Sequence, residues 1–363
     1  MNLYLHFPFC RRKCKYCALH SRVGIDEETR AKYVASLAAR TGEFLQGREG
    51  RACCDWNRKE LLSTVYFGGG SPALCALEPL FEVLAPYLAR DAEFTVELHP
   101  LDVRRETLSR LKAGGVNRIS MGVQSLDDAV LEKMGRMYSF HDAERAFALV
   151  KEYFDNAGID LIAGFPGDSA SLTPRHARLA KWDLKHASVY SIILEERSQL
   201  GALVERGLES IPDDDALMDR IALFSRMLAD LGLERYEISN YARPGFECRH
   251  NMAVWRGEDY AAFGEGAHGR LGLERTFTPP MPRFTGEVPP PQIERVSPEH
   301  DRFERTAMRL RTREGIDATH FPQWRETLDF NARQGLLSGA FPVYTLTPRG
   351  MEVCDAILEM LPM

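Results

Sequence analysis

Short apolar and β-branched stretches recur along the first half of the chain, and longer segments rich in helix-forming residues separate them. Alternating strand and helix patterns favour parallel strands joined by right-handed helical crossovers. Strands are predicted at residues 2–7, 64–67, 94–98, 118–123, 158–162 and 187–193, and helices at residues 27–46, 77–88, 127–134, 140–153 and 173–180. The pattern therefore predicts an α/β fold, an incomplete (β/α)6 barrel of the TIM type.

The pattern changes toward the C-terminus. Residues 235–238 and 261–264 are strand-like pieces that either help to close the barrel or lie beside it. Residues 276–300 carry seven prolines, which is typical of an extended linker. We therefore expect a barrel with its extension at residues 1–275, a linker at 276–300 and a further domain at 301–363.

The last 63 residues (301–363) show a helical pattern with one short strand signal. Helices are predicted at residues 302–312, from 317 to 321 onward, and at 351–361, with a segment at 332–337 leading into a strand at 343–346. Helices followed by a short hairpin are typical of a small helical domain of the winged-helix type.

Composition and charge narrow the class of protein. A formal net charge of −6 argues against a general nucleic-acid binder, which is usually basic. No run of 18 apolar residues predicts a transmembrane helix, and the first residues lack the basic and apolar regions of a signal peptide. Eight cysteines fit a reducing cytoplasm, and a peripheral contact with a membrane stays compatible with these features.

Three cysteines with short spacings follow the first predicted strand. Cys10, Cys14 and Cys17 can reach one inorganic centre, and thiolates favour zinc, Cu(I) and iron–sulfur clusters. Three ligands on one loop fit a [4Fe-4S] cluster that has one open iron, whereas structural zinc wants four ligands. A disulfide would leave an odd cysteine, and unliganded thiols are the remaining alternative.

Other unusual residues fall at the carboxyl ends of the predicted strands, where chemistry collects in a parallel barrel. Gly68, Gly69, Gly70 and Ser71 follow the second strand; such glycines form either a tight turn or a close approach to a ligand. Glu97, Gln124 and Asp160 come from the next three strands. A buried carboxylate is costly without a partner, so Glu97 indicates either a ligand or a salt bridge.

The spacing of the three cysteines resembles the signature of the radical S-adenosylmethionine (SAM) superfamily. The segments 4–10, 67–72 and 115–125 look like those of the oxygen-independent coproporphyrinogen III oxidase group, and within it like the haem chaperone branch, HemW. The similarity extends over nearly the whole chain, so residues 301–363 resemble the C-terminal domain of that group. The resemblance implies a [4Fe-4S] cluster whose open iron binds SAM.

The resemblance also implies roles for single residues. Tyr4 and Tyr16 would lean against the adenine of SAM, although both could simply cover the barrel rim. The glycines and Ser71 would hold the SAM amino group. Gln124 would bind the ribose, Arg136 the carboxylate through its planar guanidinium, and Glu97 and Asp160 would complete the site. For Arg136 taken alone, a solvated helix face is the competing interpretation.

The segment from Cys248 to Trp255 resembles the His-Asn-x-x-Tyr-Trp signature of HemW, with Val254 where tyrosine is usual. It implies a haem contact at His250, because histidine is a common ligand of haem iron. A structural histidine is the alternative. Cys53, Cys54, Cys75 and Cys354 share no spacing with the cysteine loop and are interpreted as structural.

Two functions follow from the resemblance. The first is a cytoplasmic haem chaperone that binds the cluster, SAM and haem and passes haem to an apo-haemoprotein acceptor. The second is an oxidative decarboxylase of coproporphyrinogen III that receives electrons from a flavodoxin- or ferredoxin-type donor. Leu19 stands where the enzymes carry a further cysteine, and the chain begins almost at its first strand; both features favour the chaperone. A relative that opens or methylates tetrapyrroles is a third interpretation.

Overall fold

The computed structural model describes residues 1–47, 61–168 and 174–363. Its main element is a sheet of twelve strands in the order β14-β13-β12-β11-β1-β4-β5-β6-β7-β8-β10-β9 within these ranges. The parallel part contains β11 (Tyr260–Phe263), β1 (Asn2–Phe7), β4 (Leu62–Gly69), β5 (Leu88–Leu98), β6 (Arg118–Gln124), β7 (Asn156–Ala163) and β8 (His186–Ser191). The six predicted strands and their parallel pairing are confirmed.

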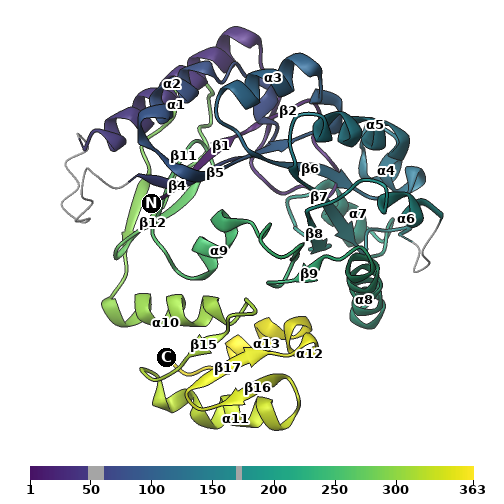
Figure 1. The fold of residues 1–363 in the computed structure, drawn as a ribbon, viewed down its shortest axis with the longest axis vertical. Helices are drawn as coiled ribbons and strands as arrows, with labels where there is room; N and C mark the ends of the chain where they lie inside the picture. Colours follow the sequence, from purple (N-terminus) through teal and green to yellow (C-terminus); the bar gives the residue numbers. More distant parts are fainter. Residues whose placement is uncertain (48–60, 169–173) are drawn as a thin grey trace.

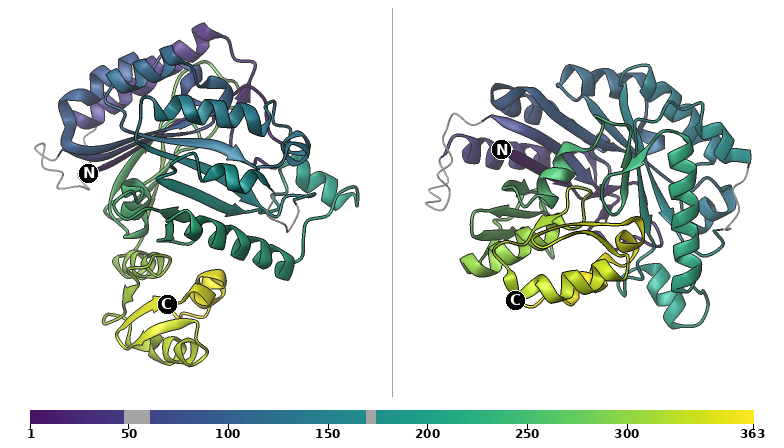
Figure 2. Two further views of the ribbon diagram at one scale, coloured as in Figure 1. Left: turned by 45° about the vertical axis from the view of Figure 1, so that its right-hand side comes forward. Right: turned by 60° about the horizontal axis from the view of Figure 1, so that its bottom comes forward.

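The sheet is curved and open, with helices along its outer face (Figures 1 and 2). These helices are α1 (Glu27–Leu45), α2 (Glu78–Leu84), α3 (Arg105–Ala113), α4 (Asp128–Met134), α5 (Phe140–Lys151), α6 (Pro174–Leu179), α7 (Gln199–Glu205) and α8 (Asp214–Asp230). Alternate side chains of β1 explain the layering, because Leu3, Leu5 and Phe7 are fully buried in the core that the helices cover. The α/β fold and its mostly parallel sheet are therefore as predicted.

The structure shows where the two further strand-like pieces lie in the sheet. The piece at 261–264 is β11, which pairs in parallel with β1 and adds a seventh parallel strand. Of the piece at 235–238, only Arg235 is in a strand, β9 (Glu234–Arg235), which lies beyond the antiparallel β10 (Asn240–Ala242) at the far edge. The helix predicted to continue to residue 88 was too long: α2 ends at Leu84, and a 3-10 turn with a proline, Ala85–Tyr87, leads into β5.

The proline-rich segment is partly ordered into the sheet. β12 (His268–Leu271), β13 (Glu274–Phe277) and β14 (Gln292–Arg295) form an antiparallel extension beside β11. β14 thus lies inside the segment predicted as a linker, immediately after its central prolines, which precede the strand and leave its ladder intact. The domain boundaries stay a prediction.

The last 66 residues (298–363) build a second core beside the barrel, seen at the bottom of Figure 1. Their elements are α10 (Pro298–Arg309), β15 (Ile316–Asp317), α11 (Arg325–Arg333), β16 (Leu337–Ala340), β17 (Val343–Leu346), α12 (Pro348–Glu352) and α13 (Cys354–Glu359). A helix opening at 317 was wrong, because the Asp317 side chain accepts from the Thr319 amide and makes a turn after β15. The closing helix is broken at Val353 into α12 and α13.

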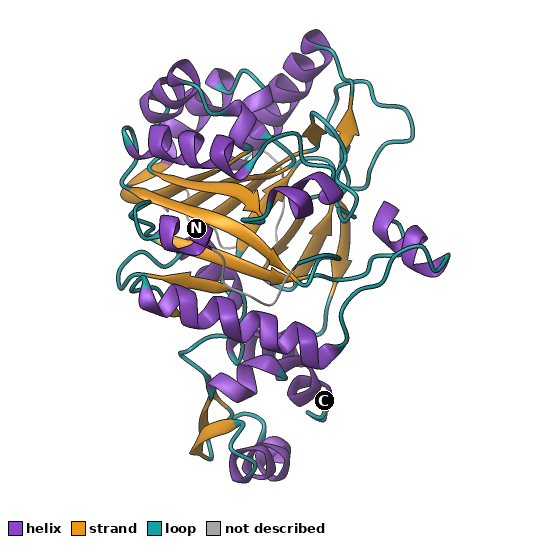
Figure 3. Cartoon of the chain, turned by 90° about the vertical axis from the view of Figure 1, so that its right-hand side faces the viewer, coloured by secondary structure: helices purple, strands orange, loops and turns teal. Residues whose placement is uncertain are grey.

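Figure 3 shows the sheet from the side, with helices above and below it. In the described part of the chain, none of these helices combines the length and the apolar character that a membrane span requires.

Candidate functional site

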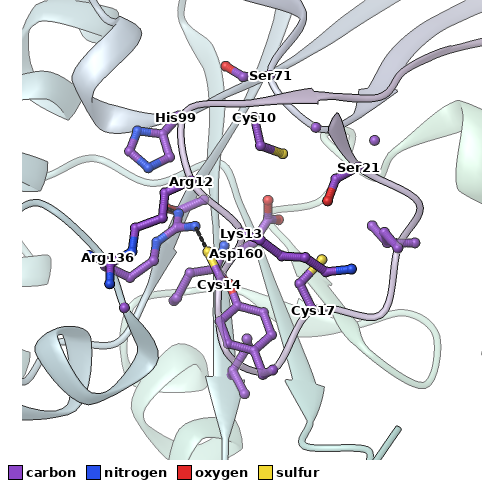
Figure 4. A pocket seen from close by; sticks show the side chains of 18 of the residues that line it. Cys10, Arg12, Lys13, Cys14, Cys17, Ser21, Ser71, His99, Arg136 and Asp160 are labelled. Carbon is purple, nitrogen blue, oxygen red and sulfur yellow. Dashed lines mark hydrogen bonds between the residues drawn. The ribbon is translucent and has the colours of Figure 1, made fainter. Parts of the chain in front are cut away.

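A cavity of about 510 Å³ lies at the carboxyl ends of the parallel strands (Figure 4). Eleven of the fourteen predicted site residues line it: Cys10, Cys14, Tyr16, Cys17, Gly69, Gly70, Ser71, Glu97, Gln124, Arg136 and Asp160. They come from segments far apart in the sequence, which the parallel strands bring to one rim. Tyr4, Gly68 and His250 do not line it.

The cysteine loop is fastened at both ends and in the middle. Its base is closed by the parallel pair β2 (Phe9–Cys10) and β3 (Arg22–Val23). In its middle, the Lys15 amide donates to the Met134 carbonyl at 3.0 Å, and the Lys15 carbonyl accepts from the Leu200 amide at 2.7 Å. The loop is thereby held between the C-terminal end of α4 and the N-terminal end of α7.

Two of the three thiols in the cysteine loop have raised pKa values. Burial raises the pKa of Cys10 to about 12, and burial also raises the pKa of Cys17. Metal binding would release these protons, as it does at thiolate sites in general. Among the described residues, no three His, Cys, Asp or Glu side chains gather closely enough to hold a single metal ion.

The glycine-rich stretch packs directly on the strand that leads into the cysteine loop. The Gly70 amide donates to the Phe7 carbonyl at 2.7 Å, and a Cβ on Gly70 would lie 2.3 Å from the Phe9 oxygen. Gly69 has φ +104°, a left-handed conformation that favours glycine. The sequence predicted either a tight turn or a ligand as the reason for these glycines. The structure shows a third reason, the close packing of two backbone segments.

Glu97 and Asp160 place two half-buried carboxyl groups in the cavity. Glu97 accepts from the Tyr66 hydroxyl and from the Gly69 amide, both at 2.9 Å. Asp160 accepts from the Ser120 hydroxyl at 3.0 Å. In the described part of the chain no Lys or Arg nitrogen lies within 4.0 Å of the Glu97 carboxylate, so the predicted alternative of a salt bridge is not seen.

In both groups, the effect of burial on the pKa outweighs the opposing charge of Arg118. Burial, followed by the neighbouring Asp160, raises the pKa of Glu97 to about 7, and burial also raises the pKa of Asp160. Because desolvation of a carboxylate is costly, the pair fits a cationic ligand in the cavity. The sulfonium and ammonium groups of SAM have that charge.

Arg136 is fixed in the cavity and does not lie on a solvated helix face. The left-handed cap Gly135 (φ +83°) ends α4 and turns the chain inward. Nε donates to the Tyr138 hydroxyl at 2.8 Å, Nη1 to the Cys14 sulfur at 3.1 Å (Figure 4) and Nη2 to the Gly122 carbonyl at 2.9 Å. A guanidinium carries five N–H groups, so two remain to bind a carboxylate.

Gln124 ends β6 in a conformation that is unusual for a residue other than glycine. Its φ is +69°, and the pairing of β6 with β7 is irregular at this point. Such a left-handed residue costs on the order of 1 kcal/mol and is found mostly at functional sites. The irregularity places the Gln124 amide in the cavity, where it could donate to a ligand hydroxyl.

The three remaining predicted residues lie deeper in the barrel. Tyr4 shares a hydrogen bond of 3.0 Å with His6 and stacks on Tyr66, and Gly68 packs against the Tyr66 ring and the Glu97 carboxyl. His250 is on α9 (Arg249–Trp255) and shares a hydrogen bond of 2.8 Å with Thr64 near the amino end of β4. The cavity is at the opposite ends of these strands, so the structure does not bring His250 to it.

Some cavity residues were not predicted from the sequence. His99 follows Glu97 by two positions and lies above Arg136 in Figure 4; burial, and then the charge of Arg136, lowers its pKa to about 3. Asp102 binds both the cysteine loop and Ser71. Position after a strand end is a signal that could have indicated both residues. Of the other cysteines, Cys75, Cys248 and Cys354 are buried, whereas Cys53 and Cys54 lie outside the described residues.

Comparison with known proteins defines the class. Residues 4–180 match the family model described as the Radical SAM superfamily. That superfamily implies a [4Fe-4S] cluster and SAM, in agreement with the thiols and the carboxyl groups of this cavity. A solved structure of the coproporphyrinogen III oxidase HemN from Escherichia coli, described as a radical SAM enzyme, has the same fold: the TM-score is 0.80 at 20% identity, over 99% of this chain and 89% of that one.

Curated relatives narrow the class to one family. The haem chaperone HemW of Mycobacterium tuberculosis (strain H37Rv) is 31% identical over 374 residues, which cover 99% of this chain and 94% of the relative. The haem chaperone HemW of Escherichia coli (strain K12) is 30% identical over 384 residues, which cover 99% and 97%. The chain therefore belongs to the HemW family of radical SAM proteins.

Proposed function

We propose that this chain is a haem chaperone that holds a [4Fe-4S] cluster on Cys10, Cys14 and Cys17, binds SAM in the adjoining cavity, and passes haem to an apo-haemoprotein. One observation carries the cofactor part: a single cavity combines three thiols with two carboxyl groups whose pKa values burial raises. The haem part is supported by the relatives along the whole chain, which are named haem chaperones.

Each cavity residue has a definite task in this proposal. The two unused N–H groups of Arg136 bind the SAM carboxylate, and Glu97 and Asp160 offset the positive charge of SAM. Gln124 donates to the ribose, and Tyr16, which packs edge-on against Phe165 with ring centroids 6.3 Å apart, covers the adenine side. A bound cluster supplies one-electron chemistry, while these residues supply position and exclude water.

The compartment and the partners follow from the same chemistry. An exposed iron in a thiolate cluster is sensitive to oxygen, so we place the protein in a reducing cytoplasm. An electron donor of the flavodoxin or ferredoxin type would reduce the cluster, and an apo-haemoprotein would receive the haem.

Anaerobic reconstitution tests the cofactor part. Iron and sulfide are measured in the wild type and in Cys10→Ala, Cys14→Ala and Cys17→Ala, with Cys75→Ala as the control because that thiol is buried outside the loop. We expect the three loop variants to lose the cluster and the control to keep it. Addition of SAM should change the electron paramagnetic resonance signal of the reduced wild type; an unchanged signal would contradict SAM binding at the cluster.

A second experiment separates the chaperone from the enzyme. The reconstituted protein is given haem and apomyoglobin in one arm, and coproporphyrinogen III, SAM and a reductant in the other. We expect stoichiometric haem binding followed by transfer in the first arm, and no protoporphyrinogen IX in the second. Multiple turnovers in the second arm would replace the chaperone with oxidative decarboxylation.

A further inference from the structure

Large apolar side chains are exposed around the opening of the cavity. Leu19 is 55% exposed, Met137 45% and Ile193 67%, and all three line the cavity together with Tyr190. They come from the cysteine loop, the segment after α4, and the end of β8 with the residues that follow it. We call these four residues the mouth patch. Apolar side chains gathered at the opening of a cavity are typical of a ligand-binding surface.

Two positively charged side chains lie at the same opening of the cavity. Arg12 and Lys13 are exposed and line the cavity, and among the described residues neither has a carboxylate within 4.0 Å. Their neighbour Arg11 differs, because it pairs with the buried Asp102. In Figure 4, Lys13 extends toward Cys17, while Arg12 lies on the side of Arg136. The mouth therefore joins an apolar surface to two positive charges that the protein itself does not neutralise.

We propose that the mouth patch, with Arg12 and Lys13, is the haem-binding surface of this chain. The inference rests on the proposed function, since it assumes that the chain binds haem. Haem is a flat apolar macrocycle with two carboxylates at one edge, so its ring matches the mouth patch and its propionates match the two cations. The surface lies at the end of the barrel opposite to His250, whose ring is buried beneath Tyr66 and Tyr4.

The volume of the cavity supports a position of haem at its mouth. The cavity of about 510 Å³ is within the size range of a site for one small ligand, and in the proposed function the cluster and SAM occupy it. A macrocycle then binds at the opening, where the exposed side chains of the mouth patch are.

The test compares haem with its dimethyl ester, in which both propionate charges are removed. Both are titrated into the full-length, anaerobically reconstituted protein and into the double variant Arg12→Ala/Lys13→Ala. We expect the double variant to bind haem three- to tenfold more weakly and to bind the ester within twofold of wild type. Haem binding by the wild type should also weaken as salt is added, because exposed charges are screened.

Three further variants isolate the causes. Ile193→Asp should weaken both haem and the ester, because it places a charge in the apolar surface. Arg12→Lys/Lys13→Arg keeps the charges and should bind haem within threefold of wild type. Arg105→Ala/Lys112→Ala removes two exposed cations of α3, on the outer side of the barrel, and should change neither titration. Iron, sulfide and the response to SAM are measured in every variant, so that a damaged cluster is recognised.

The outcomes separate this inference from the function on which it rests. If the wild type binds no haem, the proposed function fails and takes the inference with it. If the wild type binds haem and Arg12→Ala/Lys13→Ala binds it equally well, the inference alone fails. It also fails if the double variant weakens haem and the ester alike, because the cations would then not recognise propionates.

Discussion

Arg11 and Asp102 join the cysteine loop to the segment after β5. The Arg11 Nε and Nη2 atoms lie 2.6 Å and 2.5 Å from one oxygen of Asp102, and the other oxygen accepts from the Ser71 hydroxyl at 2.5 Å. Asp102 is buried, whereas Arg11 reaches the surface. One carboxylate thus connects three segments that surround the candidate cluster site.

Arg11→Ala should loosen the cluster. The variant leaves the buried Asp102 with the Ser71 hydroxyl as its remaining side-chain partner in the described structure, and we expect a loss of about 1–3 kcal/mol in the free energy of unfolding. Iron release to a chelator under anaerobic conditions should become several times faster, because the loop is held less firmly. The control is Arg105→Ala, whose pair with Glu152 is exposed and should contribute less than about 1 kcal/mol. Equal release rates for Arg11→Ala and wild type would show that this pair does not hold the loop.

Gly70→Ala should be among the most damaging single-methyl changes in the chain. Its Cβ would lie 2.3 Å from the Phe9 oxygen, and that contact involves backbone on both sides. We expect a loss of about 2 kcal/mol or more in the free energy of unfolding, together with a low iron content after reconstitution.

Gly42→Ala is the matched control. This glycine is inside α1, where an added Cβ meets only Val83 at 3.5 Å, so alanine should stabilise the protein by about 0.5–1 kcal/mol. Denaturant unfolding of both variants measures the difference. Equal stabilities would mean that the backbone around Gly70 moves freely enough to accept a side chain.

The sequence was sufficient to predict the parallel strands and most of the cavity, for a physical reason. Buried parallel strands are continuous apolar runs, and residues such as Glu97 and Asp160 interrupt them visibly. Once strands are parallel, their carboxyl ends must meet, so the predicted residues came together without any knowledge of contacts. The roles of these residues toward a ligand stay predictions.

Other features depend on contacts that leave no local pattern. β11 pairs with β1 across more than 250 residues, and nothing within either strand specifies that neighbour. In the sequence, Asp102 is one aspartate among many near a strand end, and nothing in it indicates that Arg11 is its partner. For His250, the resemblance indicated a residue type, but only the position of α9 decides at which end of the barrel the ring lies.

The pKa of Glu97 predicts an unusual dependence of stability on pH. Burial and the charge of Asp160 raise it from 4.5 to about 7, so between these values the folded protein holds a proton that the unfolded chain has lost. The free energy of unfolding should therefore fall as the pH rises from 4.5 to 7, and then level off. In the cluster-free protein, Glu97→Gln should gain roughly 2–3 kcal/mol over wild type between pH 5 and pH 8.

Glu78→Gln provides the control for this effect. Its hydrogen bond with Arg110 lowers the pKa of Glu78 below 4.5, so its ionisation contributes stability that is lost only at more acid pH. The difference between Glu78→Gln and wild type should stay constant from pH 5 to pH 8. The measurement is urea unfolding at several pH values. A Glu97→Gln curve parallel to that of wild type would mean that the carboxyl is already ionised in the folded protein.

Substitution of His250 tests whether this residue has a structural role or binds haem. Burial lowers its pKa to about 3, so the ring is neutral at pH 7, and it packs with its centroid 5.2 Å from that of Tyr66. His250→Ala should therefore lower the free energy of unfolding by about 2–4 kcal/mol, through a cavity and the loss of one of the two hydrogen bonds of the Thr64 hydroxyl. His250→Asn keeps a polar group near Thr64 and should recover part of that loss. Because the ring does not reach the mouth of the cavity, haem titrations of both folded variants should agree with wild type within about twofold. A loss of tenfold or more in haem affinity for His250→Asn, with iron content and stability near those of wild type, would instead establish the haem contact that the sequence predicts.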